Sequence, residues 1–236
     1  MKMQSVSTVY RREIRAFFLS PSAYIVMAIY LALAGWFFFS TFFLAGRADM
    51  RSFFNLMPIL FSFTIPAITM RLFSEEYSNG SFEMLKTQPV TTADIVGGKF
   101  LSAVVFVALM LVPTVIYALT VSSLGDLDWG PVAGGYLGAV LMAAAYSAIG
   151  LLASSATRNQ IVAFIVSAAV CFFLSLIDQV IWVLPAGIGG ILSRLGTAYH
   201  FSNISKGIID SRDLIYFLSV IFISLYGSWI LNQEKK

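Results

Sequence analysis

The sequence predicts an all-α membrane protein with six transmembrane helices. Of its 236 residues, 58% are hydrophobic and only 11% are charged, and the mean hydropathy is +0.84. A soluble domain usually has about a quarter of its residues charged. A helix needs about 20 mostly apolar residues to cross the hydrocarbon core of a bilayer. Six stretches reach or approach that length: 23–44, 53–70, 97–121, 132–153, 161–184 and 214–231. The chain is thus expected to be one membrane domain over 1–236.

The N-terminal segment 1–21 is predicted to be an amphipathic helix in the membrane interface. Three arginines, Arg11, Arg12 and Arg15, fall on one helical face. Apolar side chains fall on another face, which we expect to enter the acyl boundary: Val6, Val9, Tyr10, Ile14, Phe17 and Phe18. The residue before a proline disfavours helix, so this helix is expected to end before Pro21.

The distribution of lysine and arginine predicts that both termini are cytoplasmic. Positive residues near span ends are retained in the cytoplasm. With the N-terminus inside, ten of the 15 basic residues lie on the inner side and five on the outer side. An even number of spans then places 71–96 inside and 185–213 outside.

The most informative stretch follows the second span. Residues 78–81 read Ser-Asn-Gly-Ser, a turn signal, and Thr91 with Asp94 forms a predicted capping box before the third span. Segment 71–90 therefore predicts a short helix, a turn and a second short helix. It also contains three acids, Glu75, Glu76 and Glu83, although cytoplasmic segments usually have an excess of basic residues.

These residues resemble a known family. The series Arg71, Glu76, Gly80, Ser81, Glu83, Leu85, Pro89, Val90, Gly98 and Lys99 is similar to the cytoplasmic segment of ABC-2 type transporter permeases. Residues 199–217 further resemble the gliding-motility-associated permease subgroup. The similarity extends over the whole chain.

The resemblance implies a permease subunit in the bacterial inner membrane that couples to a separate cytoplasmic ABC ATPase and exports a substrate. It implies a second permease copy or paralogue, and an accessory membrane protein with an extracytoplasmic domain. It assigns an ATPase-coupling role to segment 71–90, carried by Arg71, Glu75, Glu76, Gly80, Ser81, Glu83, Leu85 and Pro89. Glu75 and Glu76 are expected to pair either with the ATPase or with Arg11, Arg12 and Arg15. A solvated charged loop is the simpler alternative.

Catalysis finds little support in the sequence. There is one histidine, one cysteine and no Gly-x-Ser-x-Gly motif. Residues 93–100, ADIVGGKF, depart from the phosphate-binding loop at Ala93 and Phe100. We therefore expect no cofactor on this chain, with ATP and Mg²⁺ bound by the partner ATPase, and no nucleic-acid partner.

Isolated polar residues near span ends receive simpler interpretations. Lys99 and Arg158 are expected to extend toward lipid headgroups from inner span ends. Asp178 lies near the outer interface, where an interfacial role and a functional one are equally open. Pro185 and the glycines after it predict short helices over 180–200 that dip into the outer leaflet. His200 is expected to cap a helix or form a hydrogen bond there.

Small residues at the start of the fourth span predict close helix packing. Glycines recur at 130, 134 and 138, followed by several alanines and Gly150. Small residues on one face let helix backbones approach closely. Lining a translocation path is the less favoured alternative.

Two other functions stay open at the sequence level. The first is mechanotransmission, in which ATP-driven motion acts on an extracytoplasmic partner and no solute crosses. The second is an intramembrane enzyme, which needs paired polar residues from different spans, and Asp178 alone does not supply them.

Overall fold

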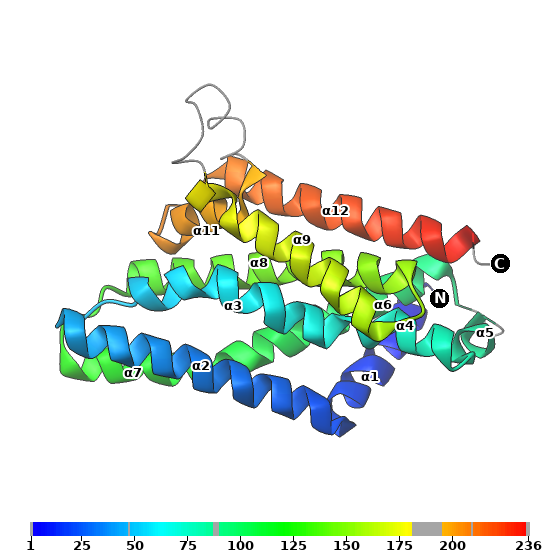
Figure 1. Ribbon diagram of the computed structural model, residues 1–236, viewed down its shortest axis with the longest axis horizontal. Helices are drawn as coiled ribbons and strands as arrows, with labels where there is room; N and C mark the ends of the chain where they lie inside the picture. The colour runs from blue at the N-terminus through cyan, green and yellow to red at the C-terminus, as the bar shows by residue number, and fades with distance from the viewer. Residues whose placement is uncertain (1, 47, 87–89, 181–194, 209, 235–236) are drawn as a thin grey trace.

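The computed structural model describes residues 2–46, 48–86, 90–180, 195–208 and 210–234. All regular structure in these ranges is helical (Figure 1). The α-helices are α1 (Lys2–Leu19), α2 (Pro21–Ala45), α3 (Arg51–Thr69), α4 (Arg71–Ser78), α5 (Ser81–Lys86), α6 (Thr92–Leu111), α7 (Val115–Leu124), α8 (Trp129–Ala156), α9 (Gln160–Val180), α11 (Thr197–Ser205) and α12 (Ser211–Glu234).

Within these residues, six helical segments are long and apolar enough to cross a membrane. They overlap the six predicted spans, and the prediction of an all-α multi-span membrane protein is confirmed. The last residues of the predicted fifth span, 181–184, lie outside the described residues. The second span continues into α4 as far as Ser78, farther than predicted. The third begins at Thr92, where the predicted capping box is formed by Thr91 and Asp94. It bends at a short 3-10 turn over Val112–Thr114, because Pro113 cannot continue the α-helical hydrogen bonds.

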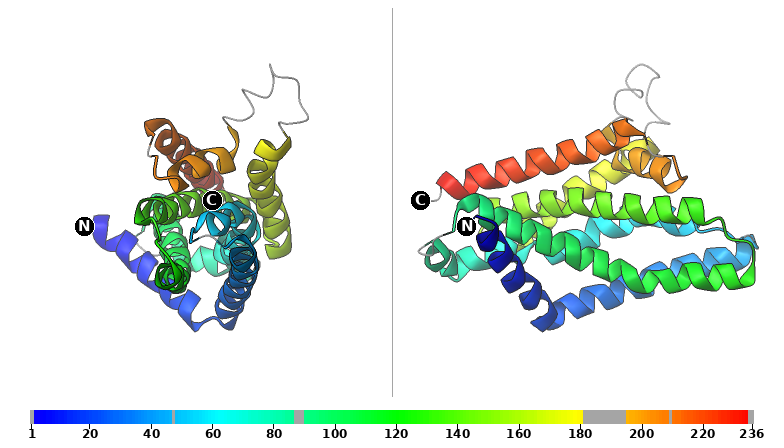
Figure 2. Two further views of the ribbon diagram at one scale, coloured as in Figure 1. Left: turned by 90° about the vertical axis from the view of Figure 1, so that its left-hand side faces the viewer. Right: turned by 180° about the vertical axis from the view of Figure 1, so that it is seen from behind.

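Both termini lie at the same end of the bundle, as expected for an even number of spans (Figure 1). That end also holds α4 and α5. The opposite end holds α11 and the connections between α2 and α3 and between α7 and α8. Helix α1 crosses the bundle at an angle to the spans (Figure 2), and it ends before Pro21 as predicted.

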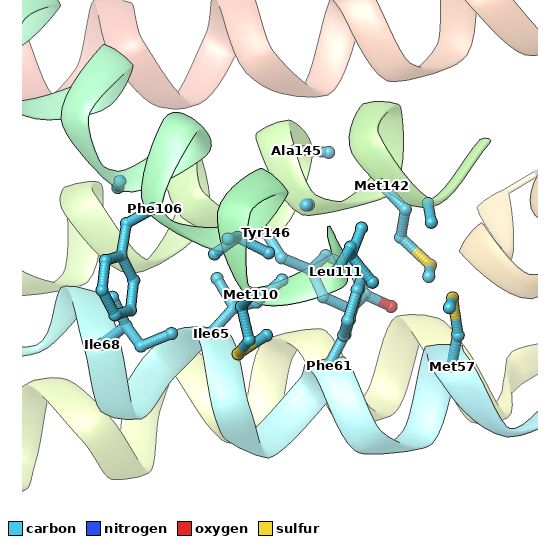
Figure 3. Close-up of a cluster of buried hydrophobic side chains, with 14 of the residues drawn as sticks. Met57, Phe61, Ile65, Ile68, Phe106, Met110, Leu111, Met142, Ala145 and Tyr146 are labelled. Atoms are coloured by element: carbon cyan, nitrogen blue, oxygen red, sulfur yellow. The ribbon is translucent and has the colours of Figure 1, made fainter. Parts of the chain in front are cut away.

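Helix α8 forms the centre of the bundle. It contacts α3, α4, α6, α9, α11 and α12, and its middle is almost completely buried. Aromatic and aliphatic side chains of α3, α6 and α8 fill the space between them, among them Phe61, Met110 and Tyr146 (Figure 3). Lipid tails are as apolar as these side chains, so close van der Waals contact is the main favourable contribution to packing between the spans.

The glycines of α8 allow the close contacts that the sequence predicted. A Cβ atom at Gly134 meets the backbone carbonyl of Ile204 in α11, and one at Gly150 meets the side chain of Thr69 in α3. At Gly138 the nearest atom is Phe201 Cδ2, 3.1 Å away. The prediction of tight packing is therefore confirmed.

The structure describes only part of segment 180–200, for which short helices were predicted. Residues 181–194, which include Pro185, lie outside the described residues, whereas α11 is a short helix before the last span. The side chain of Asp178 also lies outside the described residues.

The close contact at Gly134 predicts that a larger residue at this position lowers the stability of the protein. Gly134→Ala places its methyl group against a backbone carbonyl that no rotamer change can move, which costs roughly 1–3 kcal/mol. Gly97→Ala is the matched control, since that helical glycine has no atom within 4 Å of an added Cβ. We expect a lower melting temperature in detergent for Gly134→Ala and an unchanged or slightly higher one for Gly97→Ala. Equal melting temperatures would show that α8 and α11 are not in close contact.

Candidate functional site

The end of the bundle that holds both termini contains a buried ammonium group. Lys99 projects from α6, and only 1% of its side chain is exposed. Its Nζ lies 3.1 Å from Glu13 Oε1 of α1 and 2.9 Å from Glu76 Oε1 of α4, and it donates to the carbonyl oxygen of Leu72 at 2.6 Å. These three acceptors match the three protons of the ammonium.

The prediction that Lys99 extends to the lipid headgroups is wrong. Its charge is instead compensated inside the protein, because α1 and α4 each bring a carboxylate to it. Its Nζ also lies 5.2 Å from the centroid of the Phe73 ring, a favourable position for a cation.

Arg12 completes the group, which we call the α1–α4–α6 charge cluster: Arg12, Glu13, Glu76 and Lys99. The Arg12 Nη2 atom lies 2.5 Å from Glu13 Oε1 and 2.8 Å from Glu76 Oε1. Glu76 thus pairs with α1, one of the two partners expected from the sequence. The formal charges of two cations and two carboxylates cancel, which compensates the buried charges of Lys99 and Glu13, whereas Arg12 is partly exposed.

The charge on Glu13 depends on its neighbours. Burial by itself raises the pKa of the Glu13 carboxyl, but the charges of Lys99 and Arg12 and their hydrogen bonds outweigh burial and hold that pKa below its ordinary value. Glu13 therefore stays ionised at neutral pH.

The sequence analysis missed Glu13, although one signal was present. Glu13 is spaced four residues from both Val9 and Phe17, so an acid lies in the middle of the apolar face of α1. That face packs against the protein: Val9 and Phe17 are buried, and the Phe17 ring stacks on Phe106 of α6 with centroids 4.9 Å apart. The expectation that this whole face enters lipid is therefore corrected for Val9 and Phe17, which pack against the protein, whereas Phe18 stays exposed.

A glycine makes the approach of α1 to α6 possible. A Cβ atom at Gly98 is 2.7 Å from Val9 Cγ1 and 3.2 Å from the backbone nitrogen of Tyr10. Any larger residue would move α1 away from α6, and Glu13 would move away from Lys99.

Arg71 joins α4 to the corner between α1 and α2. Its Nη1 donates to Ser20 Oγ at 2.8 Å, and its Nη2 donates to Ser22 Oγ at 2.5 Å. Its Nε lies 4.0 Å from Glu75 Oε2. Together with the charge cluster, this gives α4 two separate attachments to the N-terminal segment.

Ser154 of α8 bridges the short break between α3 and α4 at Met70. Its hydroxyl donates to the carbonyl oxygen of Met70 at 2.7 Å and accepts from the backbone nitrogens of Phe73 and Ser74 at 3.0 and 3.1 Å. It thereby satisfies backbone groups that the first turn of a helix leaves without partners. Farther along α4, the hydroxyl of Tyr77 donates to Asn232 Oδ1 of α12.

The tip beyond α4 is an exposed turn on an apolar base. Gly80 has φ +69°, a conformation that residues with side chains rarely adopt. The rings of Phe73, Tyr77 and Phe82 pack together with centroids 4.9 to 6.0 Å apart. Leu85 is also buried, so its side chain positions α5.

Four other residues singled out from the sequence are exposed near the charge cluster. Ser81 and Glu83 are exposed at the tip, and Arg11 and Arg15 are exposed on α1. Pro89 lies outside the described residues.

His200 lies at the opposite end, in α11 (Figure 1). It is buried, with its Nδ1 2.5 Å from Asp213 Oδ1 and its ring stacked on Tyr216, so the expected hydrogen bond is present. In the part of the chain that the structure describes, no group of three or more His, Cys, Asp or Glu residues is arranged to hold a metal ion.

The bundle and its end cluster define a multi-pass α-helical membrane protein with a charge cluster at one end, where α4 extends the second span. Residues 18–190 match the model of the ABC-2 family transporter proteins. Because this match covers most of the chain, the chain belongs to that family and is an ABC transporter permease. A search of curated proteins gives no significant match.

The depressed pKa of Glu13 predicts a pH-dependent contribution to stability. In wild type, this contribution is fully present above the ordinary carboxyl pKa of 4.5 and is lost as the pH falls through the lower pKa of the folded state. Glu13→Gln removes the partner of a buried ammonium, so at pH 7 it is expected to cost about 3 kcal/mol.

Melting temperatures in detergent between pH 3 and pH 7 measure this effect. The wild-type protein is expected to melt several degrees above Glu13→Gln at pH 7, with the gap closing toward pH 3. Glu234→Gln, an exposed acid of α12 at the same end of the bundle, is expected to match wild type throughout. A gap that does not change with pH would contradict the assignment.

Proposed function

We propose that this ABC-2 permease couples ATP hydrolysis by a separate cytoplasmic ATPase subunit to the export of a substrate across the bacterial inner membrane. One observation carries the proposal: α4 extends the second span beyond the bundle, and α1, α6, α8 and α12 each contact it through a specific polar group. A movement applied to α4 is thereby transmitted to most of the bundle.

The exposed tip is the proposed docking surface for the ATPase. It consists of Gly80, Ser81 and Glu83, which are exposed, and it rests on the apolar base formed by Phe73, Tyr77 and Phe82. A rigid base is what a docking element needs, because a flexible loop would absorb the motion of the motor. Because Glu83 carries a negative charge, a basic surface on the ATPase would be complementary to the tip.

Two hydrogen-bonded contacts connect the α4 segment below the tip to other spans. The Ser154 hydroxyl connects the α3–α4 break to α8, and the Tyr77 hydroxyl connects α4 to α12. Rotation of α4 on ATP binding would therefore be expected to shift both spans relative to α3.

The remaining parts of the proposal rest on the distribution of basic residues and on the family. The excess of lysine and arginine at one side supports cytoplasmic termini. The family supports an ATPase that binds ATP and Mg²⁺, and two permease chains, identical or paralogous, that enclose the path between them. The likeness of residues 199–217 to the gliding-motility-associated subgroup supports an accessory membrane protein with an extracytoplasmic domain.

Replacing Gly80 tests the docking role. Gly80→Val forces a β-branched residue into φ +69° and distorts the turn, so ATPase stimulation by the permease is expected to fall severalfold while membrane insertion is retained. The matched control is Gly46→Val, since Gly46 has φ +59° and also has nothing within 4 Å of an added Cβ, but it lies at the opposite end of the bundle. ATP turnover and co-purification with the ATPase are the measurements, and an equal effect of both variants would remove the basis for a docking role at Gly80.

A further inference from the structure

A pocket of ≈ 500 Å³ lies beside the charge cluster, between α1, α4 and α6. This volume falls within the usual range for small-molecule sites, about 300–1,000 Å³. Ser20 lines it just before α2 begins, and Arg71 lines it in the first turn of α4. The first span begins at Pro21, so the pocket lies beside the end of that span, where lipid headgroups are expected.

A small apolar cleft between α2 and α3 lies beside the pocket. The cleft has a volume of ≈ 40 Å³, and its lining includes Val26, Ala67 and Ile68. Phe17 and Arg71 line both spaces. Next to the pocket, Leu19 is 71% exposed and Phe18 is 42% exposed. A polar pocket beside an apolar cleft matches a molecule with a polar head and an acyl tail.

The charges around the pocket favour a zwitterionic head over an anionic one. Three basic and three acidic side chains line it: Arg12, Arg71, Lys99, Glu13, Glu75 and Glu76. Their formal charges cancel, so the lining offers no net attraction to an anion. A positive and a negative side chain are nonetheless available to a ligand. Arg71 uses two of its five N–H donors on Ser20 and Ser22, and the carboxylate of Glu75 is partly exposed.

One acceptor requires a hydrogen-bond donor. Glu76 Oε2 is buried and has no hydrogen-bond partner among the described residues, a costly state for a carboxylate oxygen. A primary ammonium has three N–H donors, whereas a trimethylammonium has none.

We propose that this pocket binds the headgroup of a phospholipid with a primary amine, a phosphoethanolamine head, with one acyl chain entering the α2–α3 cleft. The phosphate meets the uncommitted N–H groups of Arg71, and the ammonium meets the carboxylates of Glu75 and Glu76. Such a lipid joins the corner between α1 and α2 to α4, beside the charge cluster.

The test measures lipid retention by the purified full-length chain, without the ATPase, so that its outcome is separate from that of the proposed function. Native mass spectrometry is carried out after incubation with equal amounts of phosphatidylethanolamine, phosphatidylcholine and phosphatidylglycerol with the same acyl chains. Phosphatidylethanolamine is expected to be retained at least tenfold more than either of the others, since one charge-assisted hydrogen bond is enough for a tenfold difference. Equal retention of the three lipids, or preference for phosphatidylglycerol, would overturn the proposal.

Three variants, one of them a control, and one soluble competitor locate the site. Glu75→Gln is expected to abolish the preference for phosphatidylethanolamine over phosphatidylcholine, whereas Glu234→Gln on α12 is expected to keep it. Ala67→Phe fills the cleft and is expected to reduce the retention of phosphatidylethanolamine severalfold. Free phosphoethanolamine is expected to compete at least a hundredfold less well than the lipid. Competition at equal concentration would identify a soluble ligand instead, and an unchanged preference in Glu75→Gln would place the lipid elsewhere.

Discussion

A buried lysine constrains the whole end of this bundle that holds both termini. The ammonium of Lys99 is removed from water, and removing a charge from water costs several kcal/mol unless opposite charges and hydrogen bonds compensate for it. Compensation comes from Glu13 of α1, Glu76 of α4 and the carbonyl of Leu72. Three segments far apart in sequence must therefore meet at one point, and a displacement of either carboxylate leaves the ammonium partly unpaired.

This constraint explains why α1 belongs to the bundle. An amphipathic helix at a membrane surface is held by partition into the interface and is free to slide along it. Here Gly98 admits α1 to van der Waals contact with α6, and the Phe17–Phe106 stack and the Glu13–Lys99 pair fix its position. Arg71 adds the corner before α2 to the same assembly. The first helix and α4 are thus held as one unit.

The sequence was sufficient to predict features that depend on local spacing. Six apolar runs predicted six spans, Pro21 predicted the end of α1, and Thr91 with Asp94 predicted the cap of α6. The glycine repeat predicted close packing of α8, since small residues at helical spacing have one common physical use. Each of these features is determined within a few turns of chain.

Features that depend on contacts between distant segments were not predicted. Lys99 looked like a cation at a span end, because nothing near it in sequence reveals the carboxylates of Glu13 and Glu76. Ser154 looked like any small residue of α8, yet its hydroxyl bridges the break between α3 and α4. Glu76 had two possible partners by charge alone, and only the three-dimensional arrangement shows that it pairs with Arg12 within the chain.

The distance between α1 and α4 during the ATP cycle is the measurement that tests whether the two helices move as one unit. Spin labels at Arg11→Cys and Asn79→Cys occupy exposed positions on α1 and at the end of α4, and the native Cys171 is buried and so protected from labelling. Pulsed electron–electron double resonance on the permease–ATPase complex, without nucleotide and with ATP trapped, gives this distance in both states. If the charge cluster holds the two helices together, the distance distribution stays the same in the two states. A shift of several ångströms between them would show that α4 moves independently of α1.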